Sequence, residues 1–327
     1  MKIISDKQVA AFKQFVDTHD TFVVAGHKEP DGDCVASCLG LSYVLEELGK
    51  SFVMVNAGPF KRSEIKQFAP LFTKTLPFMT ADERNRCGLL MADCSELYRL
   101  GEIEGDISDL DRFAVDHHKT SICDNEHSIV DASAPAASLL VLQLYEAMGF
   151  ELSKERAETF FFGTATDTGF FKFLTEDSAE VFRQTANLVE AGASPRRIHR
   201  EISSGKPWFT RKLLGTLLDK AERKLGGKLV ITYETMDDTK RLGQEGRDSD
   251  AFYSLMLAVE GVEAVAFLRQ ESEFSCTLGL RSKNSCDVSE IAAHFGGGGH
   301  KNAAGASCEG RLETMIPRVI KEFAKTL

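Results

Sequence analysis

The sequence predicts an α/β protein with an N-terminal parallel-sheet domain, a smaller C-terminal α/β domain and a cleft between them. Short apolar runs alternate with amphipathic stretches through the first half, which is typical of strand–helix repeats. Residues 191–226, rich in Gly, Pro and basic residues, interrupt this pattern. The length of 327 residues suggests two domains, at roughly 150 residues per domain. We therefore expect domains at 1–190 and 227–327, joined by a helical connector at 191–226.

The first half contains the clearest elements. The expected strands are 21–26, 51–56, 87–93 and 112–116, and the expected helices are 34–48, 135–148 and 153–166. Strands separated by helices predict a parallel sheet, with helices on both faces. Ligands of such sheets bind beyond the carboxyl ends of the strands, so the residues that follow each strand matter most.

The C-terminal part repeats the mixture of strands and helices on a smaller scale. The connector contains an expected helix that ends at Gly226 and Gly227. After it, the expected strands are KLVITYET, EAVAFLRQ and FSCTLGLRS, and the expected helices are 250–258, 287–294 and 312–326. These elements predict a second domain of about 100 residues.

Composition excludes several classes of protein. Hydrophobic residues make up 43% and charged residues 27% of the chain, as in ordinary globular domains. The net charge is 39 − 49 = −10, which does not fit a protein that coats duplex nucleic acid with a broad basic face. We find no apolar run long enough for a membrane span, no signal-peptide core and no zinc pattern among the eight cysteines. These features predict a cytoplasmic protein without a membrane partner. They leave open a local basic pocket that binds a small anion.

Acidic and histidine residues follow the expected strands. The segment GHKEPDGDCVAS places His27, Asp31 and Asp33 just after the first strand. Two carboxylates held this close repel each other unless a cation lies between them, which favours a divalent metal. The alternative is a surface turn, because Pro-Asp-Gly-Asp is good turn chemistry.

Three further segments show the same placement. Asp93 ends one apolar run, Asp116 ends the next and is followed by His117 and His118, and Asp167 breaks a helical stretch. Each alone has a capping or turn alternative. Together they predict a cluster beyond one sheet edge, whose candidate metal ligands are His27, Asp31, Asp33, Asp93, His117 and Asp167. Imidazole with carboxylate suits Mn²⁺ or Mg²⁺, and six ligands suit two ions about 4 Å apart that share a carboxylate.

A glycine run near the C-terminus is the second candidate site. Glycines 296–299 leave backbone N–H groups accessible to a phosphate, and His300 and Lys301 add charge; a flexible turn is the alternative. Arg281, at an expected strand end, offers the planar fork that binds two phosphate oxygens. Arg269 is a less certain second candidate, which we set aside.

These segments, in this order, resemble the DHH phosphoesterase family, and FGGGGHKNAAG resembles the Gly-Gly-Gly-His signature of the DHH-associated domain. The resemblance covers nearly the whole chain. It implies that His27 and Asp31 hold one metal, that Asp33, His117 and Asp167 hold the other, and that Asp93 bridges them. It further implies that Asp116 supports His117 from behind, that His118 meets the substrate phosphate or leaving oxygen, and that Arg281, Gly298, Gly299 and His300 bind substrate. One departure is APAASLLVL after Asp131, which lacks the Ser/Thr-rich and acidic pattern common in relatives.

Within the family, the chain resembles the two-domain branch of oligoribonucleases and 3′-phosphoadenosine 5′-phosphate phosphatases. That resemblance implies that the chain hydrolyses short RNA to 5′-mononucleotides, the bisphosphate to AMP, or both. It implies two divalent metal ions, with Mn²⁺ preferred to Mg²⁺. It also suggests a homodimer. The alternative is a phosphodiesterase for linear or cyclic dinucleotides such as pApA, pGpG or c-di-AMP. From other classes, a nucleotide sensor and a metal-stabilised structural protein stay open, although a sensor would be free to lose a ligand.

Overall fold

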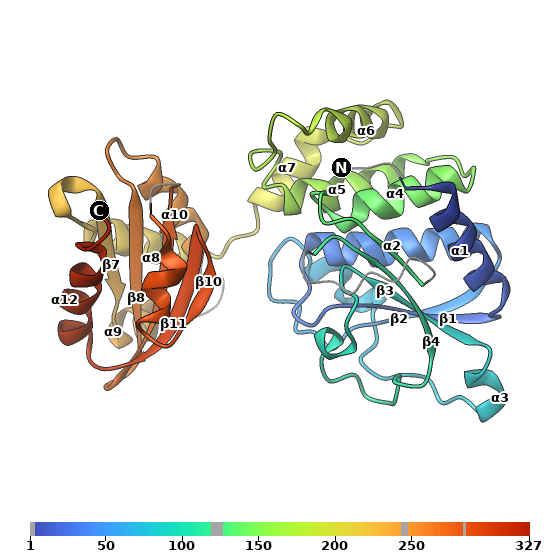
Figure 1. Ribbon diagram of the computed structural model, residues 1–327, viewed down its shortest axis with the longest axis horizontal. Coiled ribbons are helices and arrows are strands. Elements are labelled where there is room, and N and C mark those ends of the chain that lie inside the picture. Colours follow the sequence, from blue (N-terminus) through green and yellow to red (C-terminus); the bar gives the residue numbers. More distant parts are fainter. Residues whose placement is uncertain (1–3, 119–126, 243–247, 284–285) are drawn as a thin grey trace. The chain divides into compact units, whose positions relative to one another are not determined.

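The computed structural model describes residues 4–118, 127–242, 248–283 and 286–327 (Figure 1). The chain divides into two compact units, Met1–Gly205 and Lys206–Leu327. Each unit has its own sheet and its own hydrophobic core. The α/β class predicted from the sequence is therefore confirmed.

A five-stranded parallel sheet forms the centre of the first unit. Its strands are β1 (Thr21–Gly26), β2 (Ser51–Val55), β3 (Cys87–Ala92), β4 (Asp111–Asp116) and β5 (Ser128–Val130). They lie in the order β2-β1-β3-β4-β5. The order reverses between β1 and β3, and in parallel sheets the carboxyl ends at such a reversal frame the ligand site.

The longer helices of the first unit, α1, α2 and α4 to α7, gather on one face of this sheet (Figure 1). The helices are α1 (Asp6–Asp17), α2 (Gly32–Glu47), α3 (Ala81–Arg84), α4 (Ala137–Ala147), α5 (Lys154–Asp167), α6 (Ala179–Glu190) and α7 (Pro195–Ser203), with 3-10 helices η1 (Lys66–Leu71) and η2 (Leu97–Leu100). Because side chains alternate along a strand, Phe22 and Val24 of β1 pack against the helices, whereas Val23 and Ala25 face the opposite side.

That opposite face departs from the expectation of helices on both sides. The apolar residues that cover it include Leu76, Leu100 and Leu110, which lie outside the long helices. The segment after β3 contributes isolated apolar side chains and is interrupted by Gly101 and Gly105, both with positive φ. It has no sustained 3.6-residue period, so it covers the sheet as irregular chain and the short η2.

The second unit is built on a six-stranded mixed sheet in the order β10-β11-β9-β8-β7-β6. Its strands are β6 (Glu222–Lys224), β7 (Leu229–Glu234), β8 (Ala264–Ser272), β9 (Ser275–Ser282), β10 (Gly298–His300) and β11 (Ala303–Glu309). Its helices are α8 (Trp208–Asp219), α9 (Met236–Leu242), α10 (Ser249–Leu257), α11 (Val288–Ala293) and α12 (Leu312–Phe323), with the 3-10 helix η3 (Leu225–Gly227). Val288 and Val319 of α11 and α12 belong to one core cluster, and Leu213 and Phe252 of α8 and α10 to the other.

Three strands of this unit were not expected from the sequence. The charged edge strand β6 reads Glu-Arg-Lys, and β10 and β11 are rich in Gly and Ala, so neither carries the β-branched and aromatic residues typical of strands. The expected helical connector 191–226 is also divided between the units. The buried Ile198 joins α7 to the core of the first unit, whereas Leu213 and Leu217 join α8 to the core of the second.

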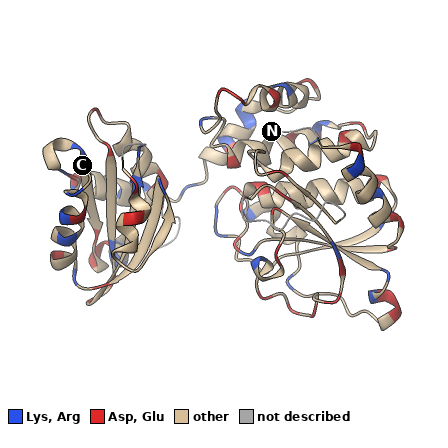
Figure 2. Cartoon of the chain, viewed as in Figure 1, with Lys and Arg blue, Asp and Glu red and all other residues tan. Residues whose placement is uncertain are grey.

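Charge is mixed over both units, with Lys and Arg interspersed with Asp and Glu (Figure 2). In the described part of the chain, every helix is too short or too polar to cross a membrane. The seven cysteines that the structure describes are free and buried.

The packing of α2, α4 and α5 makes a testable prediction at Gly163. A Cβ there would lie 2.6 Å from the Cβ of Ala36 and 2.6 Å from Oγ of Ser138. We expect Gly163→Ala to destabilise the protein by about 1–3 kcal/mol through overpacking. Gly215, inside α8, has no atom within 4 Å of an added Cβ, so Gly215→Ala should stabilise its unit by up to about 1 kcal/mol. Urea unfolding followed by circular dichroism measures both, and equal effects would contradict this account of the packing.

Candidate metal centre

Eight of the residues singled out in the sequence meet at the carboxyl edge of the parallel sheet. His27 follows β1, Asp93 follows β3, and Asp116 ends β4 and leads into His117 and His118. Asp31 and Asp33 lie at the start of α2, and Asp167 is the last residue of α5. The edge gathers them because parallel strands all end on the same side of a sheet.

The carboxylate of Asp93 lies at the centre of this cluster. Its Oδ2 is 3.3 Å from Nε2 of His27, and its Oδ1 is 3.4 Å from Nε2 of His117. The residue has a positive φ of 57°, a conformation that costs a non-glycine residue of the order of 1 kcal/mol. The side chain is buried, and within the described structure its Oδ1 has no hydrogen-bond partner.

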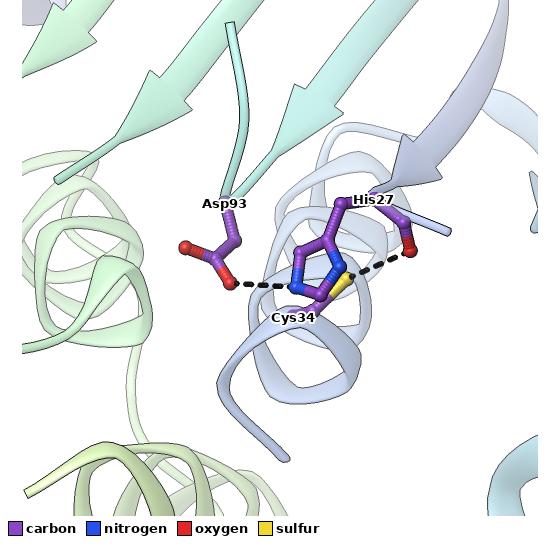
Figure 3. A group of neighbouring side chains, drawn as sticks. All are labelled: His27, Cys34 and Asp93. Atoms are coloured by element: carbon purple, nitrogen blue, oxygen red, sulfur yellow. Dashed lines mark hydrogen bonds and ion pairs between the residues drawn. The ribbon is translucent and has the colours of Figure 1, made fainter. Parts of the chain in front are cut away.

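Figure 3 shows the His27 side of the cluster. One ring nitrogen of His27 faces Asp93, while Nδ1 donates a hydrogen bond to the carbonyl of Lys28 at 2.9 Å. Asp31 caps the start of α2 by accepting from the N–H of Cys34, and its Oδ1 lies 3.8 Å from Nε2 of His27. The Cys34 thiol is close to the His27 carbonyl, at 3.9 Å. Burial raises the pKa of this thiol well above its usual range, so the thiolate needed for metal binding is disfavoured.

The His117 side contains two further carboxylates. Nε2 of His117 is 3.5 Å from Oδ2 of Asp167 and 4.0 Å from Oδ2 of Asp33. Nδ1 of the same ring donates to the carbonyl of Ala134 at 3.1 Å. In metal sites, a histidine commonly donates a hydrogen bond from one ring nitrogen to a carbonyl and binds the metal with the other ring nitrogen. The Ala134 contact leaves Nε2 of His117 available as such a ligand.

Asp33 belongs to the fold as well as to the cluster. It is fully buried, and its two oxygens accept from the backbone N–H groups of Ala137 and Ser138, at 2.6 and 3.0 Å. These amides open α4, whose own N-cap residue, Ala136, has no side-chain oxygen to offer. Asp33 therefore caps α4 from another helix.

Asp116 has a different partner from the one the resemblance implies. Its Oδ1 accepts from Nδ1 of His118 at 2.7 Å and from the backbone N–H groups of His117 and His118. The ring of His117 is supported by the Ala134 carbonyl instead. Asp116 thus holds the backbone of His117 and the ring of His118, and its support of the His117 ring stays a prediction from the resemblance.

The electrostatics fit a site that holds cations. Burial and the charges of Asp93 and Asp167 raise the pKa of Asp33 well above its usual range. Burial also raises the pKa of Asp167, to about 6. Burial alone would lower the pKa of His117, but contact with Asp93 and the charge of Asp33 raise it to about 10. A divalent cation would stabilise the ionised forms of Asp33 and Asp167, and it would give the buried Oδ1 of Asp93, which has no hydrogen bond within the described structure, a positive partner.

The substrate-binding candidates lie in the second unit, around a pocket of about 430 Å³. Arg281, Gly298 and Gly299 line it, as do Tyr253 and Arg269. The guanidinium of Arg281 stacks over the Tyr253 ring at 4.7 Å and approaches Asp250 at 3.4 Å. His300 is exposed and falls outside the lining residues, because it pairs with Ala303 at the turn between β10 and β11.

The glycine run is part of a hairpin rather than an open loop. An added Cβ at Gly297 would lie 2.1 Å from the carbonyl oxygen of Gly305, and at Gly299 2.5 Å from that of Ala303. At Gly296 and Gly298 an added Cβ would meet no atom within 4 Å. Two of the four glycines therefore allow β10 to approach β11, and Gly298 leaves open space beside the pocket.

Sequence reasoning missed several residues at the two sites. The buried Asn56 donates to the carbonyl of His27 and accepts from the N–H of Gly58. It follows β2, so the strand-end signal that found Asp93 would have found it. Arg62 approaches Asp31 at 3.9 Å, and Arg99 donates to Nε2 of His118 at 3.1 Å. Both arginines lie in irregular or 3-10 segments where no pattern marks them, and Arg269 had been set aside although it lines the pocket.

Asp33 and Asp167 should differ in their effect on stability. Asp33→Ala leaves two buried amides of α4 without their acceptor, so we expect a loss of about 1–2 kcal/mol in metal-free protein. Asp167→Ala removes a carboxylate that contacts His117 but accepts from no buried helix amide, so we expect it to cost less than Asp33→Ala. Thermal unfolding in the presence of a chelator measures both, and an equal loss would contradict the capping role of Asp33.

The raised pKa values predict how metal-free protein responds to pH. Because the pKa of Asp167 in the folded protein is about 6 and that of His117 about 10, the folded state binds protons more tightly than the unfolded chain. The resulting stability is present at low pH and is lost as pH rises, through about 6 for Asp167 and between about 6.5 and 10 for His117. We expect the melting temperature in chelator to fall from pH 6 to pH 8.5. The rise on adding Mn²⁺ should grow over the same range, because metal binds the deprotonated ligands. A melting temperature that rises with pH in chelator would refute this.

Comparison with known proteins places this geometry in context. Residues 21–164 match the DHH family, N-terminal domain, and residues 229–327 match the DHHA1 domain. The chain is 31% identical to the bifunctional oligoribonuclease and PAP phosphatase NrnA of Thermus thermophilus, over 93% of this chain and 89% of that one.

Solved structures show the same fold. An exopolyphosphatase-related protein from Bacteroides fragilis matches with a TM-score of 0.83 and 23% identity, over 99% of this chain and 98% of that one. Exonuclease RecJ bound to manganese matches with a TM-score of 0.53 and 15% identity, over 100% of this chain and 97% of that one. With both domain models matched in order and a full-length relative above 30% identity, the chain belongs to the DHH family, with an N-terminal DHH domain and a C-terminal DHHA1 domain.

Proposed function

We propose that this chain is a metal-dependent phosphoesterase that hydrolyses short oligoribonucleotides to 5′-mononucleotides, 3′-phosphoadenosine 5′-phosphate to AMP, or both. The observation that carries the proposal is the cluster around the buried Asp93. Its Oδ1, which has no hydrogen bond within the described structure, faces His117, and its Oδ2 faces His27. Three further carboxylates lie beside these two rings, those of Asp31, Asp33 and Asp167. The full-length similarity to a bifunctional oligoribonuclease and PAP phosphatase supports the choice of substrate class.

The metal ligands are assigned by position around Asp93. His27 and Asp31 would hold one ion, Asp33, His117 and Asp167 the other, and Asp93 would contribute an oxygen to each. Two divalent cations there would lower the pKa of an attacking water and neutralise charge on the phosphoryl oxygens. The imidazole–carboxylate set suits Mn²⁺, with Mg²⁺ as the alternative.

The remaining residues orient the reaction. Water adds to phosphorus, the bond from phosphorus to the 3′-oxygen breaks, and that oxygen leaves with a proton, so the released nucleotide carries a 5′-phosphate. Asp116 fixes the ring of His118 beside Asp93, within reach of the reacting phosphate. In the DHHA1 domain, Arg281 with Gly298 and Gly299 would bind a second phosphate or the nucleotide end. The guanidinium donates hydrogen bonds to phosphate oxygens, and glycines in the pocket wall let a phosphate come close to the backbone. His300 would be a further contact, from the exposed end of the hairpin.

The charge and cysteine content support a small-anion enzyme of the cytoplasm. The net charge of −10 argues against wide contact with duplex nucleic acid, and the free cysteines are those of a reducing compartment. Membrane association is not part of the proposal, and a homodimer stays a prediction from the family resemblance.

Hydrolysis of 5′-labelled RNA from two nucleotides upward, beside 3′-phosphoadenosine 5′-phosphate, pApA, pGpG and c-di-AMP, tests the proposal. With Mn²⁺ we expect mononucleotides to be released fastest from the shortest RNAs, or AMP from the bisphosphate, and no turnover with chelator. Asp93→Asn should lower kcat by at least about 10³-fold, because it removes a charged ligand at the centre of the site.

Each other outcome has a distinct meaning. Turnover of pGpG or c-di-AMP alone would favour the dinucleotide phosphodiesterase. Nucleotide binding without any turnover, by protein that has bound Mn²⁺, would favour a sensor and overturn the enzymatic proposal. Unfolding of the chain on removal of metal, with no hydrolysis in its presence, would favour a structural metal site.

A further inference from the structure

Arg99 is a cation at the metal centre that no sequence motif indicates. It lies in η2, six residues after Asp93, and its guanidinium donates to Nε2 of His118 at 3.1 Å. Its backbone carbonyl accepts from the N–H of Lys28 at 2.8 Å, directly after His27. The segment after β3 is thereby tied to the segment after β1, and the arginine is held at the edge where the candidate ligands gather.

The hydrogen bonds around His118 can run in only one direction. A guanidinium has donors and no acceptor, so Nε2 of His118 must accept with its lone pair. Nδ1 then carries the proton and donates it to Oδ1 of Asp116 at 2.7 Å. In this arrangement the outer nitrogen of His118 has no proton to give, and the positive charge that faces the site is that of Arg99.

Arg99 also lacks the carboxylate partner that several other arginines of the first unit have. Arg84, Arg86 and Arg156 each pair with a carboxylate. Among the residues that the structure describes, no carboxylate lies within 4 Å of the Arg99 guanidinium, although the site beside it is rich in acids. The group is half-buried, and the contact with His118 uses only one of its N–H donors.

We propose that Arg99 binds a non-bridging oxygen of the phosphate being hydrolysed, and that His118 holds the guanidinium in place for it. This inference rests on the proposed function and adds a residue to it. A planar guanidinium matches two phosphate oxygens, and a fixed cation beside the phosphorus stabilises the charge that develops in the transition state. The role needs a cation free of carboxylate partners, which is how Arg99 is placed.

The test compares Arg99→Ala and Arg99→Lys with Arg86→Ala, which removes an exposed arginine paired with Asp20. Using the best substrate of the RNA and nucleotide panel and saturating Mn²⁺, we expect Arg99→Ala to lower kcat by about 10²–10³-fold. Arg99→Lys should recover only part of this loss, because an ammonium lacks the fork. Arg86→Ala should match the wild type. Mn²⁺ affinity and melting temperature should be unchanged in all three, and guanidinium ion added to Arg99→Ala should restore activity in part.

Three outcomes would overturn the inference. The first is a kcat for Arg99→Ala within about twofold of the wild type. The second is a loss of Mn²⁺ binding in that variant. The third is a lowered melting temperature of that variant together with no recovery of activity when guanidinium ion is added. If the wild type hydrolyses none of the substrates, the proposed function fails. Calorimetric titration of Mn²⁺-loaded protein with AMP then tests separately whether Arg99 binds phosphate. Weaker AMP binding by Arg99→Ala than by Arg86→Ala would support that role, and equal binding would refute it.

Discussion

A buried carboxylate without sufficient protein partners is the constraint on which this molecule depends. Asp93 follows the central strand β3 with a strained backbone, and one of its oxygens is left without a hydrogen bond in the described structure. Burying such a charge is unfavourable unless a cation compensates it. The neighbouring imidazoles compensate part of the negative charge of Asp93, but Asp33 and Asp167 add negative charge to the same place. The fold therefore holds an excess of negative charge in this cluster, which the binding of divalent cations would neutralise.

The cluster is also continuous with the core of the first unit. Asp33 accepts the two amides that open α4, whose own sequence, Ala-Pro-Ala-Ala, supplies no capping side chain. The unusual APAASLLVL segment is thus accommodated by a residue from α2. The same carboxylate caps a helix and belongs to the candidate metal site, so helix packing fixes the orientation of a candidate ligand oxygen.

Much of the first unit could be read from the sequence because its signals are local. The apolar runs that became β1 to β4 are continuous, and the polar residues that end them, His27 and Asp93 among them, were found by that position alone. Contacts that depend on how a loop turns, or on distant segments, could not be predicted from the sequence. The contact of Asp116 with the nearby His118 depends on the turn of its loop, and Arg99 lies in the short η2, which is joined to Lys28 from a distant segment. Likewise β10 and β11 are strands because they pair with each other and with β9, although their Gly and Ala residues have little intrinsic preference for a strand.

The four consecutive glycines of the DHHA1 domain appear uniform in the sequence, but the hairpin makes them unequal. Gly297 and Gly299 are required because the facing backbone leaves no room for a methyl group, whereas the space beside Gly298 is open. A side chain at Gly298 would therefore meet no steric obstacle, whereas one at Gly297 or Gly299 would displace the facing backbone. Because Gly298 also lines the pocket that contains Arg281, it is the one of these three positions where a substitution would reshape the pocket wall and leave the hairpin in place.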